Sequence, residues 1–195
     1  MASAEGFWKR QRRLHIKPWF NTFNAWKHIN YGSTKVHFKK HLDGGGNDFG
    51  QDFIPFLTLR QMPRQRRVFE WCAGPGFIGF SLLAHGFTET LCLADINPQA
   101  VEACHRTVRD NQLADRVSVY LSDNLTDIAA SEEWDLVVGN PPHMPDDYIG
   151  DLRTHDEEWH IHRNFFGAVE RFLKPAGLLC CKRTIEVPQP RLSIR

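Results

Sequence analysis

The amino-acid sequence predicts an α/β domain with a Rossmann-like, doubly wound and mainly parallel sheet between two layers of helices. Three observations lead to this prediction. From Arg67 onward, apolar runs of strand length alternate with helical segments. A glycine-rich turn follows the first of these runs, and acidic or amide residues follow the later ones. Strands that are separated by helices pair in parallel through right-handed crossovers, which gives an open sheet with both faces covered.

The predicted elements follow one another at regular intervals. Strands are expected at 68–72, 90–95, 117–121, 134–138 and 178–182. Helices are expected at 77–85, where Gly86 supplies the C-cap, and at 98–111, where Pro98 stands in the first turn. The segment 123–130 is predicted to be a weak helix or a loop. A capping box at Thr154 and Glu157 predicts a helix that continues to Leu173, and the proline- and glycine-containing segment 174–177 is expected to end it.

The residues before the sheet differ from it in charge. Lys and Arg outnumber Asp and Glu by 13 to 4 in residues 1–67, a net charge of +9, and are outnumbered 11 to 19 in residues 68–195, a net charge of −8. We therefore predict a basic, aromatic-rich N-terminal extension over residues 1–48 and a second domain over residues 49–195. The extension is expected to be irregular or partly helical to residue 41. A loop follows over 42–48, because three consecutive glycines oppose regular structure, and a short helix is expected at 49–57.

The basic segment admits two interpretations, and the sequence leaves both open. Its cations are interleaved with aromatic residues, namely Trp8, Trp19, Phe20, Phe23, Trp26, Tyr31 and Phe38. This combination suits a nucleic acid, because phosphates attract cations and bases stack on aromatic rings. In the other interpretation, the aromatic rings pack onto the acidic domain and the charges are solvated or paired.

Composition limits the class of protein. The chain has 195 residues, of which 42% are hydrophobic and 24% charged, as in an ordinary globular protein. It contains no apolar run long enough to predict a membrane span and no apolar signal core in residues 1–13. The five cysteines have no metal or redox spacing, so we expect reduced core thiols and a cytoplasmic location.

The glycine-rich turn is the first candidate binding site. Gly74 and Gly76 follow the strand that contains Glu70, and glycine allows the backbone to approach a ligand closely and to adopt a positive φ. In an open parallel sheet, ligands bind beyond the carboxyl ends of the strands at the topological switch point. The run Gly74–Gly79 also fits the G-x-G-x-x-G pattern, with Asp95 about 20 residues further on, so an oxidoreductase that binds a nicotinamide or flavin dinucleotide is one alternative.

Three residues favour S-adenosyl-L-methionine as the cofactor. Glu70 precedes the glycines inside the first strand, where its carboxylate can bind near the ammonium group of the cofactor, directly or through water. Asp123 follows the third strand, where it can meet the adenine amino group. Asn140 follows the fourth strand, beside the expected position of the reacting methyl group. Asp95, at the end of the second strand, suits ribose hydroxyls in either cofactor.

On these residues the sequence resembles the class I S-adenosylmethionine-dependent methyltransferases, in particular the small N-methyltransferases with an Asn-Pro-Pro-aromatic motif. The resemblance covers about residues 49–183. It implies cofactor contacts for Glu70, Cys72, Ala73, Gly74, Gly76, Asp95, Ile96, Asn97, Asp123, Asn124 and Asn140. Two positions depart from the family pattern, because Cys72 replaces the first glycine and His143 replaces the aromatic residue. The stretch Phe49–Asp52 corresponds to a segment that often closes over the cofactor.

The motif Asn140-Pro141-Pro142-His143 is the candidate catalytic site. A planar amino group is a poor nucleophile because its lone pair is delocalised. Hydrogen bonds from its two N–H groups to Asn140 Oδ1 and the Pro141 carbonyl would point the nitrogen at the methyl group and favour the more tetrahedral transition state. Pro141 and Pro142 stiffen the loop, and His143 is expected to stack on the planar target. This chemistry requires no metal ion.

The motif alone does not choose the substrate. An exocyclic amine of a base in RNA or DNA and the side-chain amide of a protein glutamine both present a planar amino group. The basic aromatic segment favours nucleic acid, RNA in particular, with a flipped or single-stranded base in the pocket.

A hypothesis from another class is a non-catalytic partner subunit that binds the cofactor. The sheet lacks the strands expected after Arg183, and an exposed sheet edge invites pairing with another chain. The histidines and acids of residues 155–162 are interpreted as a capped helix start, not as a metal site.

Overall fold

The computed structural model describes residues 25–43, 46–144 and 154–181. Five parallel strands form its main sheet, in the spatial order β5-β4-β3-β6-β7. These strands are β3 (Gln65–Trp71), β4 (Thr88–Asp95), β5 (Val117–Leu121), β6 (Trp134–Gly139) and β7 (Leu173–Cys181). The strand order reverses at β3, which lies between β4 and β6. This confirms the predicted Rossmann-like, doubly wound fold.

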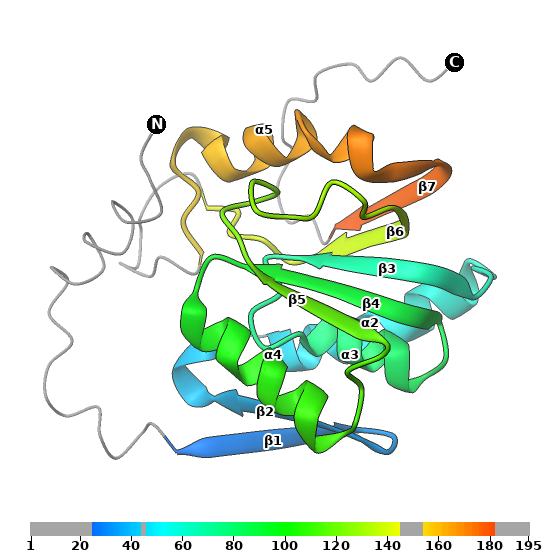
Figure 1. Cartoon of the computed structure of the whole chain (residues 1–195), viewed down its shortest axis with the longest axis vertical. Coiled ribbons are helices and arrows are strands. Elements are labelled where there is room, and N and C mark those ends of the chain that lie inside the picture. The colour runs from blue at the N-terminus through cyan, green and yellow to red at the C-terminus, as the bar shows by residue number, and fades with distance from the viewer. Residues whose placement is uncertain (1–24, 44–45, 145–153, 182–195) are drawn as a thin grey trace, which may run out of the picture.

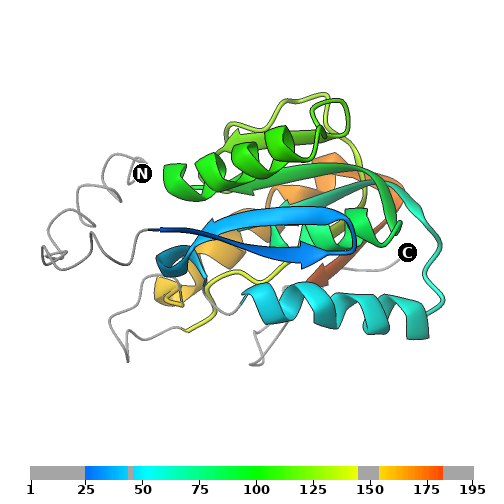
Figure 2. The ribbon, with the colours of Figure 1, turned by 90° about the horizontal axis from the view of Figure 1, so that it is seen from below.

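Helices cover both faces of the sheet, as parallel connections require (Figures 1 and 2). One face carries α2 (Gly46–Leu59), α3 (Phe77–Ala84) and α4 (Pro98–Asp110). The other carries α5 (His160–Phe166), flanked by the 3-10 turns η3 (Glu157–Trp159) and η4 (Val169–Phe172). No helix in these described segments is long and apolar enough to cross a membrane.

Alternate residues of β3 enter two separate apolar cores, one on each face of the sheet. Val68 packs in the core beneath α3, whereas Phe69 and Trp71 pack in the core beneath α5. In the second core, the rings of Trp71 and Phe165 stack with their centroids 3.7 Å apart, and those of Phe69 and Trp134 at 4.0 Å. The strand register therefore decides which side chains reach which face.

The prediction of an irregular or partly helical segment up to residue 41 is wrong for its described part. Residues 26–39 form an antiparallel hairpin of β1 (Trp26–Tyr31) and β2 (Thr34–Lys39), with Gly32 in the turn at φ 53°. Tyr31, Val36 and Phe38 point inward and join the core beneath α3. The hairpin lies against α4 and α3 on the side away from the sheet, as Figure 2 shows. Residues 1–24 lie outside the described part.

The loop expected over 42–48 is shorter than predicted, because α2 begins at Gly46 and not at Phe49. Glycine suits this first turn because α2 packs closely on α3. A Cβ at Gly46 would lie 2.9 Å from the Phe77 ring, and one at Gly50 would lie 2.7 Å from the Phe77 carbonyl oxygen. The glycines here permit close packing, which local propensity does not predict.

The helices α3 and α4 agree with the prediction to within one residue at each end. Gly86 follows α3 at φ 76°, the left-handed conformation that glycine favours. At the start of α4, Asn97 Oδ1 accepts a hydrogen bond from the Gln99 amide at 3.0 Å, and Pro98 occupies the first turn. The weak helix or loop expected at 123–130 is a succession of turns whose Leu125 and Ile128 are buried.

A continuous helix from Thr154 to Leu173 is not observed. Glu158 and Trp159 adopt left-handed φ values of 50° and 60°, which separate η3 from α5. The side chain of Asp156 caps α5 by accepting the Ile161 amide at 2.8 Å and the His162 amide at 3.3 Å. The Thr154 carbonyl instead accepts the amides of the loop after β6. Asp156 rather than Thr154 thus caps α5.

The final strand is longer than predicted and sits at the edge of the sheet. β7 begins at Leu173 and includes residues 174–177, which were expected to be a helix stop. Its pairing with β6 is irregular between Trp134 and Leu136, where the extra residues are accommodated. Cys180 and Cys181 are half-buried, since an edge strand has less cover than a central one, and all five cysteines are free thiols.

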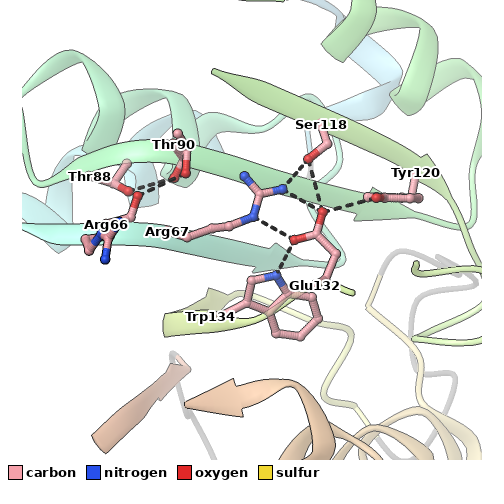
Figure 3. Close-up of polar contacts among 8 residues, drawn as sticks. All are labelled: Arg66, Arg67, Thr88, Thr90, Ser118, Tyr120, Glu132 and Trp134. Atoms are coloured by element: carbon pink, nitrogen blue, oxygen red, sulfur yellow. Dashed lines mark hydrogen bonds and ion pairs between the residues drawn. The ribbon is translucent and has the colours of Figure 1, made fainter. Parts of the chain in front are cut away.

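A buried charged network crosses the sheet on the α5 face (Figure 3). Glu132, 8% exposed, accepts hydrogen bonds at 2.6 Å from both Nε and Nη2 of Arg67. Tyr120 Oη and Trp134 Nε1 each donate to the same carboxylate at 3.1 Å. Burial alone would raise the pKa of Glu132, but the bonds from Arg67 hold this pKa below its usual value. The network ties the loop before β6 to three strands.

Candidate active site

The loops that follow β3, β4, β5 and β6 meet at one edge of the sheet, because the strands are parallel. β3 and β6 are adjacent at the switch point, and Trp71 pairs directly with Gly139. A Cβ at Gly139 would lie 2.7 Å from the Trp71 carbonyl oxygen, so glycine allows the two strand ends to approach. Asn140 consequently begins its loop beside Cys72.

The turn after β3 has three left-handed residues. The φ values are 50° at Cys72, 53° at Gly74 and 80° at Gly76. Cys72 therefore holds a conformation that favours glycine, which explains why a glycine is usual at this position of the family pattern. A Cβ at Gly76 would meet the Phe80 ring at 2.8 Å, whereas one at Gly74 would meet nothing closer than the Leu42 carbonyl oxygen at 3.9 Å. Gly74 thus presents bare backbone to open space.

Asp95 joins this turn to the start of α4. Its Oδ2 accepts the Gly74 amide at 2.7 Å, and its Oδ1 accepts the Asn97 amide at 2.8 Å. Burial raises the pKa of the Asp95 carboxyl above its usual value, although these hydrogen bonds oppose the shift. The strand ends are also tied by backbone bonds from Ala73 N to Ala94 O at 2.9 Å and from Ser122 N to Asp95 O at 3.0 Å. Ile96, between Asp95 and Asn97, is half-buried.

Glu70 contacts the start of α3 and not open space. It is 2% exposed, and its carboxylate accepts the Gly79 amide at 2.7 Å and the Ile78 amide at 3.3 Å. Burial raises the pKa of Glu70 to about 8, against the effect of these two bonds. A Cβ at Gly79 would lie 2.7 Å from Glu70 Oε2, so Gly79 leaves room for the carboxylate. In this structure Glu70 anchors α3 beneath the glycine turn.

The two candidates after β5 differ in their surroundings, since Asn124 bonds to Trp71 of β3 and Asp123 interacts electrostatically with His160 at the start of α5. Asp123 is half-buried, and burial is the main cause that raises the pKa of its carboxyl. Asn124 has a φ of 54°, and its Oδ1 accepts the Trp71 indole N–H at 2.8 Å. The Asn124 side chain therefore supports the α5 face, and Asp123 is the acid left at the edge of the sheet.

The loop after β6 leaves Asn140 without a side-chain partner in the described part of the chain and is anchored at His143 and Met144. Within the described residues, the half-buried side-chain amide of Asn140 has no hydrogen-bond partner. His143 Nδ1 lies 3.2 Å from the Pro141 carbonyl oxygen, so this nitrogen carries the proton and Nε2 is left as an acceptor in the neutral ring. The amides of His143 and Met144 donate to the Thr154 carbonyl at 3.0 and 2.8 Å. Pro142 is half-buried between these anchors.

Sequence reasoning missed the support behind this loop. Asp156, 1% exposed, pairs with His162 through Oδ2 and Nδ1 at 2.6 Å, and its backbone amide donates to the Met144 carbonyl at 2.8 Å. The ring of His162 packs edge-on against Trp71 at 5.3 Å. The six-residue spacing of Asp156 and His162 fits no local motif, so only the fold brings them together. Among the described residues, no group of three or more His, Cys, Asp or Glu could hold a metal ion.

The segment before and within the first turn of α2 lies against the glycine turn. Tyr31 Oη donates to the Asn47 carbonyl at 3.0 Å, and Asn47 Nδ2 donates to Asp43 Oδ2 at 2.8 Å. Gly50 packs on the Phe77 carbonyl, where α3 begins. The backbone of the stretch 49–52, which corresponds to a cofactor-covering segment, is therefore helical and adjacent to the site.

Comparison with known proteins agrees with this geometry. The model of the methyltransferase small domain matches residues 39–189. The release factor glutamine methyltransferase of Clostridium acetobutylicum is 26% identical over 137 residues, which are 63% of this chain and 48% of that protein. The ribosomal RNA small subunit methyltransferase C of Haemophilus influenzae (strain 86-028NP) is 33% identical over 131 residues, which are 66% of this chain and 38% of that protein. The chain thus spans less than half of these two relatives.

A solved structure agrees in fold. The T. thermophilus 16S rRNA N2 methyltransferase RsmC, in complex with AdoMet and guanosine, superposes with a TM-score of 0.57 at 15% identity and covers 80% of this chain and 41% of that one. The sheet order and the glycine turn define a class I methyltransferase domain. More specifically, the chain belongs to the methyltransferase small domain family. This confirms the family resemblance that the sequence predicts.

Proposed function

We propose that this chain transfers a methyl group from S-adenosyl-L-methionine to a planar amino group, the exocyclic amine of an RNA base. One observation carries the proposal. Trp71 pairs with Gly139, so the glycine turn and Asn140 leave adjacent strand ends, and the Asn140 amide has no partner among the described residues. A binding turn and a free amide therefore face the same edge of the sheet.

The residues of the edge suit this cofactor. Gly74 offers backbone with open space beside it, and Asp95 and Asp123 offer carboxylates at two neighbouring strand ends. Each oxygen of Asp95 accepts one backbone amide and retains a further lone pair for a ribose hydroxyl. When bound, the cofactor supplies a methyl group that is already activated on a sulfonium. The protein then has only to bind, orient and deprotonate the amine.

The loop after β6 supplies acceptors on one side of the target amine. Asn140 Oδ1 and the Pro141 carbonyl oxygen can each accept one of its N–H groups, since the carbonyl keeps a second lone pair beside His143 Nδ1. The nitrogen lone pair is then directed away from the loop. Preorganised acceptors of this kind favour the transition state, in which positive charge develops on the nitrogen. In this proposal the ring of His143 stacks on the planar target.

Two classes of substrate suit this arrangement, an RNA base and a protein glutamine. Each is named in one of the two relatives, a ribosomal RNA methyltransferase and a release factor glutamine methyltransferase. We favour RNA because exposed cations of the hairpin, Lys27 and Lys35, and of α4, Arg109, have no ion-pair partner within the described residues. A protein glutamine gains nothing from such cations, whereas a phosphate backbone does.

The test is transfer of labelled methyl from S-adenosyl-L-methionine to cellular RNA and protein fractions. Asn140→Ala is expected to lower the rate about 100-fold or more, the usual effect of removing one preorganised hydrogen-bonding group. Asn164→Ala, the same substitution at an exposed position of α5, is the control. S-adenosylhomocysteine affinity, measured by calorimetry, should stay unchanged in Asn164→Ala and should fall far less than the rate in Asn140→Ala, because Asn140 is only one of several expected cofactor contacts. Wild-type transfer rates in Asn140→Ala would refute the assigned role, and labelling of protein alone would replace RNA by glutamine as the substrate.

The hypothesis of a partner chain at the sheet edge has one supporting observation. Within the described residues β7 pairs only with β6, and Leu178 on β7 is 49% exposed. An open edge with an exposed apolar side chain can extend the sheet through a second chain. Sedimentation analysis tests this, and a monomer at all concentrations together with methyl transfer would remove the partner-subunit hypothesis.

A further inference from the structure

One aromatic ring holds two cations that come from different elements. Trp26 opens β1, and Lys39 stands opposite it at the end of β2. Lys39 Nζ lies 4.7 Å from the centroid of the Trp26 ring, and Arg106 Cζ, on α4, lies 4.8 Å from it. Contacts of this length are cation–π interactions, which offset part of the cost of placing like charges together. The ring is thus a scaffold for a cation pair.

These two cations share one weak anionic contact, from Arg106 to Asp110. The two distances place the charges within about one Debye length of each other at 0.1 M salt, so they repel. Arg106 Nε is buried without a hydrogen-bond partner. Its nearest acid, Asp110, is 4.0 Å away and sits 2.7 Å from His37 Nε2. Within the described residues Lys39 has no ion pair. An external anion bound here would therefore form ion pairs with both Lys39 and Arg106.

The surrounding surface extends the positive charge. Residues that face each other across the hairpin share a face, so Lys35 lies on the side that carries Trp26 and Lys39, together with His28 and the buried His37, whereas Val36 and Phe38 lie on the other side. We call this surface, with Arg106 of α4, the hairpin–α4 face. The acids next to it are the exposed Glu102 of α4 and Asp110, whose carboxylate lies 2.7 Å from His37 Nε2 and 4.0 Å from Arg106 Nε.

The hairpin–α4 face reaches the candidate active site. Trp26 packs on Leu42 and on Ala100 and Ala103 in the first turns of α4. The cap of the same helix, Asn97, donates its amide to Asp95 at the cofactor edge. Leu42 carries the carbonyl nearest to Gly74. A chain bound along the face would therefore arrive at the loops that contain the glycine turn.

We propose that the hairpin–α4 face binds the phosphate backbone of single-stranded RNA, with Lys39 and Arg106 contacting phosphates while Trp26 holds them in place. A repeating row of phosphates matches two neighbouring cations on a surface with further positive charge along it. The inference rests on the proposed function, since the bound strand would present its base to Asn140. Binding itself requires no methyl transfer and is measured separately.

The test is titration of the wild-type chain with a fluorescent oligouridine at several salt concentrations. The logarithm of the binding constant falls linearly with the logarithm of the salt concentration, and the loss of two phosphate contacts should lower the magnitude of this slope by about 1.4. This corresponds to about 25-fold weaker binding at 0.1 M salt. This is the result expected for the double variant Lys39→Gln with Arg106→Gln. The variant Lys39→Arg with Arg106→Lys keeps both charges and should bind within about threefold of the wild type, because phosphate attraction is mainly a matter of charge.

A matched control removes two cations elsewhere. Arg60 and Arg171 also lie over aromatic rings, those of Phe56 at 5.5 Å and Phe172 at 4.5 Å. The double variant Arg60→Gln with Arg171→Gln should bind oligouridine as the wild type does. Unchanged S-adenosylhomocysteine affinity in all variants shows that the fold is intact.

The outcomes separate this inference from the proposed function. Equal weakening by the two glutamine pairs, or no weakening by either, overturns the hairpin–α4 face as the binding surface. No binding of oligouridine by the wild type also overturns it, and tighter binding of oligothymidine would make DNA the ligand in place of RNA. Selective weakening without any methyl transfer to RNA supports the face and refutes the proposed function alone.

Discussion

Glu70 offers a test of how the glycine turn is supported. Its carboxylate is 2% exposed and accepts two amides at the start of α3, and burial raises its pKa from 4.5 to about 8. The unfolded chain releases this proton near pH 4.5, whereas the folded chain keeps it until about pH 8. Between these values the folded state binds more protons, so the free energy of unfolding falls as pH rises.

The size of the effect follows from the two pKa values. One pKa unit corresponds to about 1.4 kcal/mol, so the Glu70 contribution to the unfolding free energy falls by about 4 kcal/mol between about pH 5 and pH 9. Glu70→Gln removes the titration and retains one acceptor, which suits the shorter bond to Gly79. The lost bond to Ile78 costs about 1 kcal/mol at every pH. Wild type is therefore expected to be the more stable protein at pH 5 and the less stable one at pH 9.

The assay is urea unfolding of wild type and Glu70→Gln at matched ionic strength across this pH range. The difference between the two proteins isolates Glu70, because groups that titrate equally in both proteins cancel. Glu133→Gln, at an exposed position, controls for the loss of one carboxylate. Two parallel stability curves would refute the reasoning, since they would show that Glu70 titrates alike in the folded and unfolded chains.

Three further stability predictions follow from the same structure, all measured by urea unfolding at pH 7. Glu132→Ala leaves the Arg67 guanidinium without its carboxylate and should lower the unfolding free energy by about 3 kcal/mol, and a loss below about 1 kcal/mol would show that solvent replaces the partner. Cys72→Gly relieves a left-handed φ of 50° and should raise stability by about 0.5–1 kcal/mol. Gly76→Ala should lower stability by at least about 2 kcal/mol, because its Cβ would lie 2.8 Å from the Phe80 ring. A loss of stability in Cys72→Gly would contradict the strain assigned to Cys72.

The basic segment shows why composition alone left two interpretations open. Tyr31 and Phe38 are 2% and 7% exposed and belong to the core, as the packing interpretation expected. Trp26 is half-buried and its ring lies against two cations. It therefore neither belongs fully to the core nor offers a free ring on which a base could stack. Whether an aromatic residue faces the core depends on strand pairing, and the turn at Gly32 that sets this pairing was not recognised in the sequence.

The order of strands and helices, the glycine turn and the polar residue at each strand end were determined by the sequence itself. These features depend on local periodicity and on residues such as Gly76 and Pro98, whose backbone preferences act within one turn. The right-handed crossover rule then places the four loops at one edge without knowledge of any contact. A candidate site could therefore be proposed from residues such as Asp95 and Asn140 before the fold was known.

Only the tertiary structure decided what each side chain contacts. Glu70 turns to the amides of α3, Asn124 turns to the Trp71 indole, and Asp156 holds His162 with its side chain and the loop after β6 with its backbone amide. The left-handed residues Glu158 and Trp159, which separate η3 from α5, were likewise not predicted. Trp71 and Asn124 lie 53 residues apart in the chain, and the other partners are separated by a turn or a change of direction that no helical or strand periodicity spans. Their hydrogen bonds form only after packing has removed water from the groups concerned, so no local pattern predicts them.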